Sequence, residues 1–411
     1  AGIFAHPVLE ERTRRGQTLR KDSVSLSTVP SITSADRTTT MPLSYAQQRL
    51  WFLDQYENNN TPVYNIPIVL PLPGHIDELA IKESIAHVIS RHEALRTIFV
   101  MEKGEPLQKV MTMPFMDFEV VTGRPDQVHD LIKDEVCISF DLSAGPLMRS
   151  RLIKAGDEDY TLCVVQHHII GDGWSTGMFV RELEEVYNAK QEGRTPDLEE
   201  ALLQYGDFAC WQKDWLKGDV YEQKIAFWKK ELNELPTMQL PTDYSRPGTV
   251  TYEGECLHFN IDTSLILGFQ GLARNTRGTL YTVLFSVFNV LMSRYSGSED
   301  IVIGTPVANR MNKQQESLYG LFVNMLAMRN DLSGNPSFET LVRQVTTRSL
   351  GAFSHQDIPF EQVVNGVLTE RDPSRSPLFQ VMFALENESD EVKIDLQGVK
   401  SKIANAAGKF Y

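Results

Sequence analysis

Two adjacent histidines in the segment TLCVVQHHIIGDGWS (161–175) are the residues best suited to chemistry. The apolar run before them predicts a β-strand over 161–168, and neighbouring side chains on a strand point to opposite faces. His167 and His168 therefore cannot share one role, because one imidazole belongs to the interior and the other can project from the sheet. Since an imidazole titrates near neutral pH, it suits proton transfer to or from a substrate nucleophile.

The loop after the histidines places Asp172 between two glycines, Gly171 and Gly173. Glycines accept backbone angles that other residues resist, and they let a substrate approach closely. A carboxylate in this loop could orient the imidazole or hold the loop through an arginine. We expect no metal site, because neighbours that face opposite ways cannot chelate one ion and no third ligand is near.

The elements around this loop predict the fold. The segment 174–190 has the spacing of an amphipathic helix, so the loop joins a strand end to a helix start, where open α/β sheets place functional groups. Strands and helices also alternate in the second half: we predict strands over 255–262, 300–309 and 378–387, helices over 221–232 and 338–353, and two helices within 264–295. This alternation predicts an α/β fold with two lobes.

Composition excludes several classes of function. The chain has 411 residues, more than one core usually fills, and its net charge of -14 argues against a nucleic-acid binder. Four scattered cysteines without a CxxC pair predict free thiols in a reducing cytoplasm. The longest apolar stretch, 280–292, is too short to cross a bilayer, and we see no secretory signal. We expect a cytoplasmic protein that binds neither membrane nor nucleic acid.

The chain divides into four parts by pattern. Residues 1–16 look like the end of a helix, and 17–41 are rich in Ser, Thr and charge without periodicity, which predicts a linker. We assign 42–215 to a first lobe that carries the histidines and 216–411 to a second lobe, which we expect to be incomplete at its end. This order predicts a fragment of a larger multidomain polypeptide.

The string HHIIGDG (167–173) resembles the active-site motif HHxxxDG of the condensation domains of nonribosomal peptide synthetases. The resemblance extends over almost the whole chain in the order of that family, through PLSYAQQRLWFL (42–53), RHEALRTIF (91–99), YGDFACWQ (205–212), IGTPVANR (303–310), YGLFVNMLAMR (319–329), HQDIPFEQVV (355–364) and RDPSRSPLFQVMF (371–383). In addition, residues 3–16 resemble the last helix of a peptidyl carrier protein.

The resemblance implies a fold and a reaction. Two lobes that each resemble chloramphenicol acetyltransferase form a V, with an active-site tunnel between them. An acceptor amine attacks a donor thioester, and both substrates arrive on phosphopantetheine arms of upstream and downstream peptidyl carrier proteins. No carrier serine motif or adenylation motif is present, so we expect this chain to bind no phosphopantetheine of its own and to work beside an adenylation domain.

The resemblance also implies roles for residues. His168 is the catalytic histidine, as orienter of the amine and proton acceptor, and His167 supports it from inside the lobe. Oxyanion stabilisation by protonated His168 or by the backbone N–H of Gly173 is a competing role. We expect Asp172 to be structural and paired with a buried arginine. The remaining candidates are Arg310 as first choice for that arginine, Arg96 as second, and Asn309, Asn324, Trp174 and Ser175 as tunnel residues.

Three alternatives share the histidine motif. An acyltransferase that uses acyl-CoA is disfavoured by the strings AQQRLW and RHEALRT and by the carrier-like N-terminus. An epimerisation domain of the same superfamily is disfavoured by RHEALRTIF and RDPSRSPLFQ. A non-catalytic relative that recruits partners would tend to lose the active-site string, which is intact here. Within the condensation class, we favour a donor of L configuration.

Overall fold

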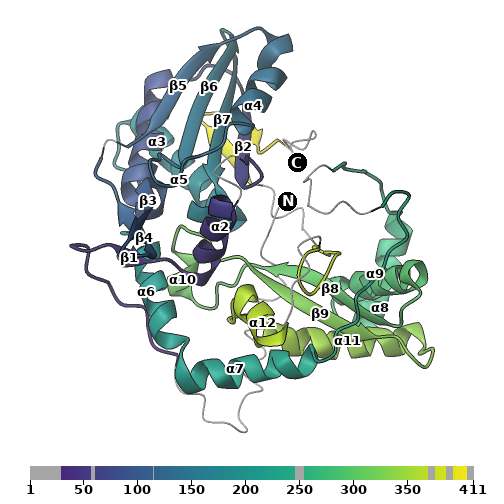
Figure 1. The fold of residues 1–411 in the computed structure, drawn as a ribbon. Helices are drawn as coiled ribbons and strands as arrows, with labels where there is room; N and C mark the ends of the chain where they lie inside the picture. Colours follow the sequence, from purple (N-terminus) through teal and green to yellow (C-terminus); the bar gives the residue numbers. More distant parts are fainter. Residues whose placement is uncertain are drawn as a thin grey trace.

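A computed structural model describes residues 29–56, 61–113, 115–245, 254–368, 375–385 and 392–404. The first lobe is built on a four-stranded sheet in the order β2-β7-β6-β5, which Figure 1 shows in its upper half. Within this sheet, only β5 and β6 run parallel. The strands are β2 (Asn65–Pro73), β5 (Asp117–Thr122), β6 (Met148–Gly156) and β7 (Asp159–His167).

The central strand β7 is buried along its length apart from Asp159, which explains the apolar run over residues 162–165. The helices of this lobe are α2 (Tyr45–Tyr56), α3 (Glu78–Arg91), α4 (Val128–Val136) and α5 (Gly173–Glu192). A small sheet in the order β1-β4-β3 completes it, from β1 (Met41–Pro42), β3 (Thr97–Glu102) and β4 (Glu105–Val110). Helix α6 (Tyr205–Trp215) leads towards the second lobe.

The second lobe is centred on the antiparallel pair β8 (Asp300–Val307) and β9 (Asn324–Asp331). Figure 1 shows it in the lower half, with its helices around this pair. The helices are α7 (Gly218–Glu231), α8 (Thr263–Thr276), α9 (Leu280–Ser296), α11 (Phe338–Phe353) and α12 (Phe360–Val367). Residues 386–387 of the predicted strand at 378–387 lie outside the described residues. The described part forms a single parallel bridge between Met382 and Gly304 of β8, with hydrogen bonds between Gly304 and residues 381 and 383.

One predicted strand is wrong. Residues 254–262 form no strand, and the apolar side chains that alternate along this segment are exposed, with Leu257 at 86% and Phe259 at 77%. Alternation of apolar residues predicts a strand only where a neighbouring strand pairs with it. No pairing is observed here in the part of the chain that the structure describes.

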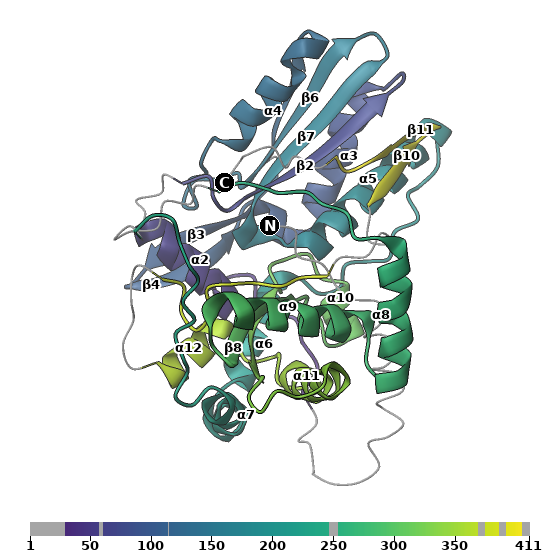
Figure 2. The same cartoon turned by 90° about the vertical axis from the view of Figure 1, so that its right-hand side faces the viewer.

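The predicted lobe boundary at 215/216 does not separate the two cores. Leu318, Tyr319, Leu321 and Phe322 belong to the core of the first lobe, next to the short helix α10 (Lys313–Glu316). The hairpin β10 (Lys393–Leu396) and β11 (Val399–Lys402) also packs on the first lobe, against β2 and α5, as Figure 2 shows. The second half of the chain therefore returns to the first lobe twice.

The predicted linker is only partly a linker. Residues 1–28, including the predicted carrier tail, lie outside the described residues. Residues 29–41, in contrast, pack on the folded body: Ile32 is 4% exposed within the first core, and Arg37 forms an ion pair with buried Asp207 of α6. The indole of Trp211 donates to the carbonyl of Pro30. This stretch is part of the domain.

Candidate active site

The histidine pair lies where β7 ends. The strand stops at His167, and His168 opens a single 3₁₀ turn (His168–Ile170) that leads to the start of α5. The predicted strand therefore ends one residue early. The backbone N–H of His168 donates to the carbonyl of Tyr64 at 2.8 Å, which anchors the turn to the start of β2.

His167 faces the interior of the first lobe and is 2% exposed. Its Nδ1 accepts a hydrogen bond from the backbone N–H of Ile169 at 3.1 Å, and its ring contacts Phe140 and Tyr64 edge-on. Burial, and next the neighbouring His168, lower the pKa of His167 to about 3. His167 is therefore a neutral scaffold residue whose ring nitrogen holds the turn.

His168 is half-buried, and one of its ring nitrogens is fixed by the backbone. Its Nδ1 lies 2.8 Å from the carbonyl oxygen of Gly171. A carbonyl only accepts, so Nδ1 must carry the proton, and Nε2 then holds a free lone pair in the neutral ring. No described residue hydrogen-bonds to Nε2. Burial lowers the pKa of His168 by more than Gly171 and Asp172 raise it, so the ring is neutral at pH 7.

Asp172 and Arg310 form a buried ion pair between the two halves of the chain. Arg310 Nη2 lies 3.2 Å from Asp172 Oδ1, and the side chains are 1% and 3% exposed. Asp172 also accepts hydrogen bonds from the backbone N–H groups of Ser175 and Phe322, at 3.0 Å and 2.9 Å. Burial alone would raise the pKa of Asp172, but Arg310 and these donors outweigh it and lower it.

Asp172 therefore acts as the N-cap of α5 and also binds the backbone of a segment from the second half, at Phe322. Burial also lowers the pKa of Arg310, yet a guanidinium titrates so far above neutrality that it keeps its charge. The second arginine that we considered is not the partner: Arg96 donates to the carbonyl of Met111 at 2.8 Å. Of the two arginines, the structure thus pairs Arg310 with the motif aspartate.

The four expected tunnel residues divide into two groups. Ser175 is fully buried, and its hydroxyl is held by Asp172 and the carbonyl of Gly320. Asn324 donates to the carbonyls of Gln356 and Ile358 and accepts from the backbone N–H of Phe360. Their polar atoms are thus used by the scaffold, and their role as tunnel residues stays a prediction.

Trp174 and Asn309 are half-buried. The indole of Trp174 donates to the carbonyl of Glu316 at 3.0 Å, and its ring faces the guanidinium of Arg310. Asn309 has a left-handed backbone with φ of 54°, and its Oδ1 is buried without a hydrogen-bond partner in the described part of the chain. Of the four, only Asn309 keeps an unsatisfied polar atom.

Residues 37–409 match the protein family described as "Condensation domain". The chain belongs to the condensation-domain family. The prediction from sequence of a condensation domain of nonribosomal peptide synthetases, which catalyse peptide-bond formation, is confirmed.

Relatives support the same assignment. This condensation domain is 40% identical over 395 residues to a component of the linear gramicidin synthase of Brevibacillus parabrevis, and the match covers 94% of this chain and 5% of that protein. It is 37% identical over 391 residues to a dimodular nonribosomal peptide synthase of Bacillus subtilis (strain 168), and that match covers 93% of this chain and 16% of that protein. The chain therefore spans a small part of the curated relatives that it matches.

The fold is also shared with a solved structure. The X-domain from teicoplanin biosynthesis superposes with a TM-score of 0.84 at 23% identity, covering 92% of this chain and 85% of that one. The predicted α/β fold with two lobes resembling chloramphenicol acetyltransferase is confirmed.

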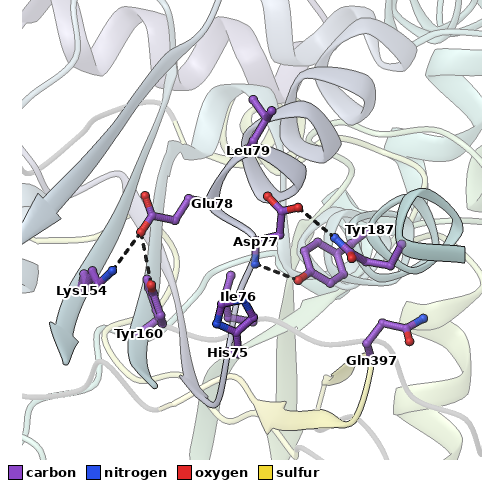
Figure 3. A pocket seen from close by; sticks show the side chains of 10 residues that line it. His75, Ile76, Asp77, Glu78, Leu79, Lys154, Tyr160, Tyr187 and Gln397 are labelled. Carbon is purple, nitrogen blue, oxygen red and sulfur yellow. Dashed lines mark hydrogen bonds and ion pairs between the residues drawn. The ribbon is translucent and has the colours of Figure 1, made fainter. Parts of the chain in front are cut away.

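The condensation domain also has a surface pocket of about 740 Å³, away from the histidines. Figure 3 shows its lining, which includes His75, Asp77 and Lys154. It lies at the opposite end of β2 and β7, because Pro73 pairs with Asp159 whereas Asn65 pairs with His167. The polar groups that line it bind one another: Lys154 is paired with Glu78, the side chain of Gln191 donates to the carboxylate of Asp77, and the backbone N–H of Asp77 donates to the hydroxyl of Tyr187.

Neither a metal centre nor a membrane span is present among the described residues. No group of three or more His, Cys, Asp or Glu side chains there is arranged to hold a metal ion. Within the same residues, no helix is long and apolar enough to span a membrane.

Sequence reasoning assigned no role to Gln166 or Tyr319, which meet directly beneath the motif loop. Gln166 directly precedes the string HHIIGDG, and Tyr319 is the first residue of YGLFVNMLAMR, both of which the family resemblance used. The one signal for them was the polar Gln166 inside an otherwise apolar strand, because a buried amide needs hydrogen-bond partners.

Proposed function

We propose that this condensation domain joins an acceptor aminoacyl amine to a donor acyl or peptidyl thioester, with His168 as the residue that receives the proton. The observation that carries this proposal is the neutral imidazole of His168, whose Nδ1 is occupied by Gly171 and whose Nε2 is left as a base. Upstream and downstream carrier proteins supply both substrates on phosphopantetheine arms, through a tunnel between the lobes.

The protein contributes to the reaction by aligning the substrates and by transferring a proton. The amine nitrogen attacks the thioester carbonyl, the C–N bond forms, and the C–S bond breaks to release the donor carrier's thiol. Nε2 of His168 accepts the proton from the attacking nitrogen and returns it to the departing sulfur. Alignment of two tethered substrates lowers the barrier by about 7–11 kcal/mol, and a general base adds roughly 10²–10⁴-fold.

The carbonyl oxygen becomes negative during attack and needs a donor. The backbone N–H of Gly173 opens α5 and is half-buried beside the motif loop, where the positive end of the helix favours an anion. Asp172 is bound by Arg310, Ser175 and Phe322, so it supports the loop and takes no proton. Asn309 remains the candidate from the second half for a contact to substrate.

The experiment is a condensation assay with loaded donor and acceptor carriers, comparing the wild-type chain with His168→Ala. We expect the rate to fall by about 10²–10⁴-fold. His75→Ala is the matched control, an exposed histidine at the far end of the same sheet, and should leave the rate unchanged. An unchanged rate in His168→Ala would remove the assignment of His168 as base.

The same assay separates the alternatives. Turnover with acyl-CoA in place of the loaded donor carrier would indicate a free acyltransferase. Racemisation of a single loaded carrier without amide formation would indicate epimerisation. We also infer that the chain works in a reducing cytoplasm beside an adenylation domain, which fits its four free cysteines and its small share of the multidomain relatives.

A further inference from the structure

The carbonyl of Gly171 decides which nitrogen of His168 is free, and two buried side chains lie directly against this glycine. A Cβ added to Gly171 would lie 3.0 Å from Gln166 Oε1 and 3.1 Å from the ring of Tyr319. The Cα of Gly171 thus rests on the amide of Gln166 and on the tyrosine ring. If the side chain of Gln166 or Tyr319 moved, Gly171 would move with it, and so would the carbonyl that binds His168.

Gln166 and Tyr319 are themselves held in place by a chain of hydrogen bonds. The hydroxyl of Tyr319 donates to Gln166 Oε1 at 2.6 Å, and Gln166 Nε2 donates to the hydroxyl of Thr176 at 3.1 Å. Gln166 is 0% exposed and Tyr319 is 2% exposed, so water cannot replace either partner. Burial also raises the pKa of the Tyr319 hydroxyl, which stays a donor across the working range.

Tyr319 reaches this position from the second half of the chain. The adjacent residues fix the segment on the motif loop, since the N–H of Gly320 donates to Ser175 and the N–H of Phe322 donates to Asp172. The segment that carries Tyr319 therefore cannot move away without breaking the contacts of the ion pair. The geometry of His168 depends in this way on a residue more than a hundred positions further along the chain.

We propose that Tyr319 and Gln166 are positioning residues that set the tautomer of His168 by holding the Gly171 carbonyl in place. This inference rests on the proposed role of His168 as base. Without the tyrosine hydroxyl, the Gln166 amide has an unsatisfied buried oxygen and must turn towards another donor. Because Gly171 lies on this amide, its carbonyl shifts and Nδ1 loses the acceptor that keeps it protonated.

The test compares Tyr319→Phe with Tyr281→Phe in the full chain. Tyr281 is a matched control, a buried tyrosine whose hydroxyl lies 2.9 Å from that of Thr305 in the second lobe. We expect Tyr319→Phe to lower kcat by about 10- to 100-fold with little change in KM, by analogy with the loss of a hydrogen-bonding partner behind a metal-ligating histidine. Tyr281→Phe should leave kcat unchanged.

A second readout does not depend on activity. In the chain labelled with ¹⁵N-histidine, ring NMR should show His168 as the Nδ1–H tautomer in the wild type and in Tyr281→Phe, and as a mixture in Tyr319→Phe. The signal is assigned by its loss in His168→Gln. If Tyr319→Phe does not accumulate as folded protein, Gln166→Met removes the same acceptor and should give the same mixture.

The outcomes separate the two proposals. An unchanged tautomer in Tyr319→Phe, or a loss of kcat that Tyr281→Phe matches, overturns the positioning role. A changed tautomer with an unchanged kcat supports the positioning role and contradicts the use of His168 as base. A changed tautomer with a reduced kcat supports both.

Discussion

The buried pair of Asp172 and Arg310 should carry a large part of the stability of the domain, and Asp172→Ala tests this. The substitution leaves the Arg310 charge in a site where its side chain is 1% exposed. Loss of one partner from a buried pair costs about 3–5 kcal/mol, and loss of the N-cap of α5 adds about 1 kcal/mol. The expected sum of about 4–6 kcal/mol is a large fraction of the 5–15 kcal/mol typical of a folded protein.

The measurement is urea unfolding of Asp172→Ala and of the exchanged variant Asp172→Arg/Arg310→Asp. The exchange restores opposite charges, but an arginine at 172 cannot accept from the N–H groups of Ser175 and Phe322. We therefore expect only partial recovery of the free energy of unfolding and of soluble protein. Asp126→Ala, in a pair that is about 70% exposed on both sides, is the control and should change stability by less than about 0.5 kcal/mol.

The contribution of Asp172 to the free energy of unfolding depends on pH in a direction that its pKa determines. The pKa of Asp172 is lower in the folded chain than in the unfolded chain. Its contribution is therefore complete above the unfolded value of about 3.9 and is lost as the pH falls through the folded value. A folded, active Asp172→Ala protein that loses less than about 1 kcal/mol would refute the reasoning on the pair.

Three further predictions concern other parts of the domain. The imidazole of His168 should take up its second proton only below pH 6.5 in ¹⁵N-histidine NMR titrations, because burial lowers its pKa; protonation at or above pH 6.5 would contradict a neutral imidazole. Asn324→Ala should lower the free energy of unfolding in urea by about 1–3 kcal/mol at unchanged KM, because the buried N–H of Phe360 loses its acceptor. A raised KM at full stability would instead indicate contact with substrate. Arg37→Ala leaves the buried carboxylate of Asp207 without its ion-pair partner. It should therefore lower the free energy of unfolding by about 1–2 kcal/mol and speed proteolysis before residue 41. Equal proteolysis in both proteins would show that the segment is not anchored there.

Local patterns predicted the parts of the fold that local interactions determine. The prediction of two helices within 264–295 is close to the observed bounds of α8 and α9, and the apolar run before His167 predicted the central strand. The alternation of side chains predicted one buried and one more exposed histidine, and the family resemblance assigned the exposed position to His168. The structure has this arrangement, although the strand ends between the two residues. The choice of Arg310 over Arg96 came from the family resemblance and could not come from spacing alone.

The errors come from contacts between distant residues. Ile32 lies in a stretch rich in Ser and Thr that shows no helical or strand periodicity, so no pattern marks it, yet it enters the first core. The segment around Phe259 alternates like a strand but is exposed, because pairing depends on a partner that local sequence does not specify. The acceptor for His168 is a backbone carbonyl of Gly171, and residue identity carries no information about a carbonyl.

The two returns of the chain to the first lobe limit how related domains can be recombined. A chimaera joined at 215/216 would place Asp172 opposite a foreign arginine and would lay a foreign hairpin along the edge of β2. The exchangeable unit is instead discontinuous, with residues 29–215 accompanied by 310–322 and 392–404 from the same parent. Engineers who seek new donor or acceptor selectivity should therefore move these three pieces together.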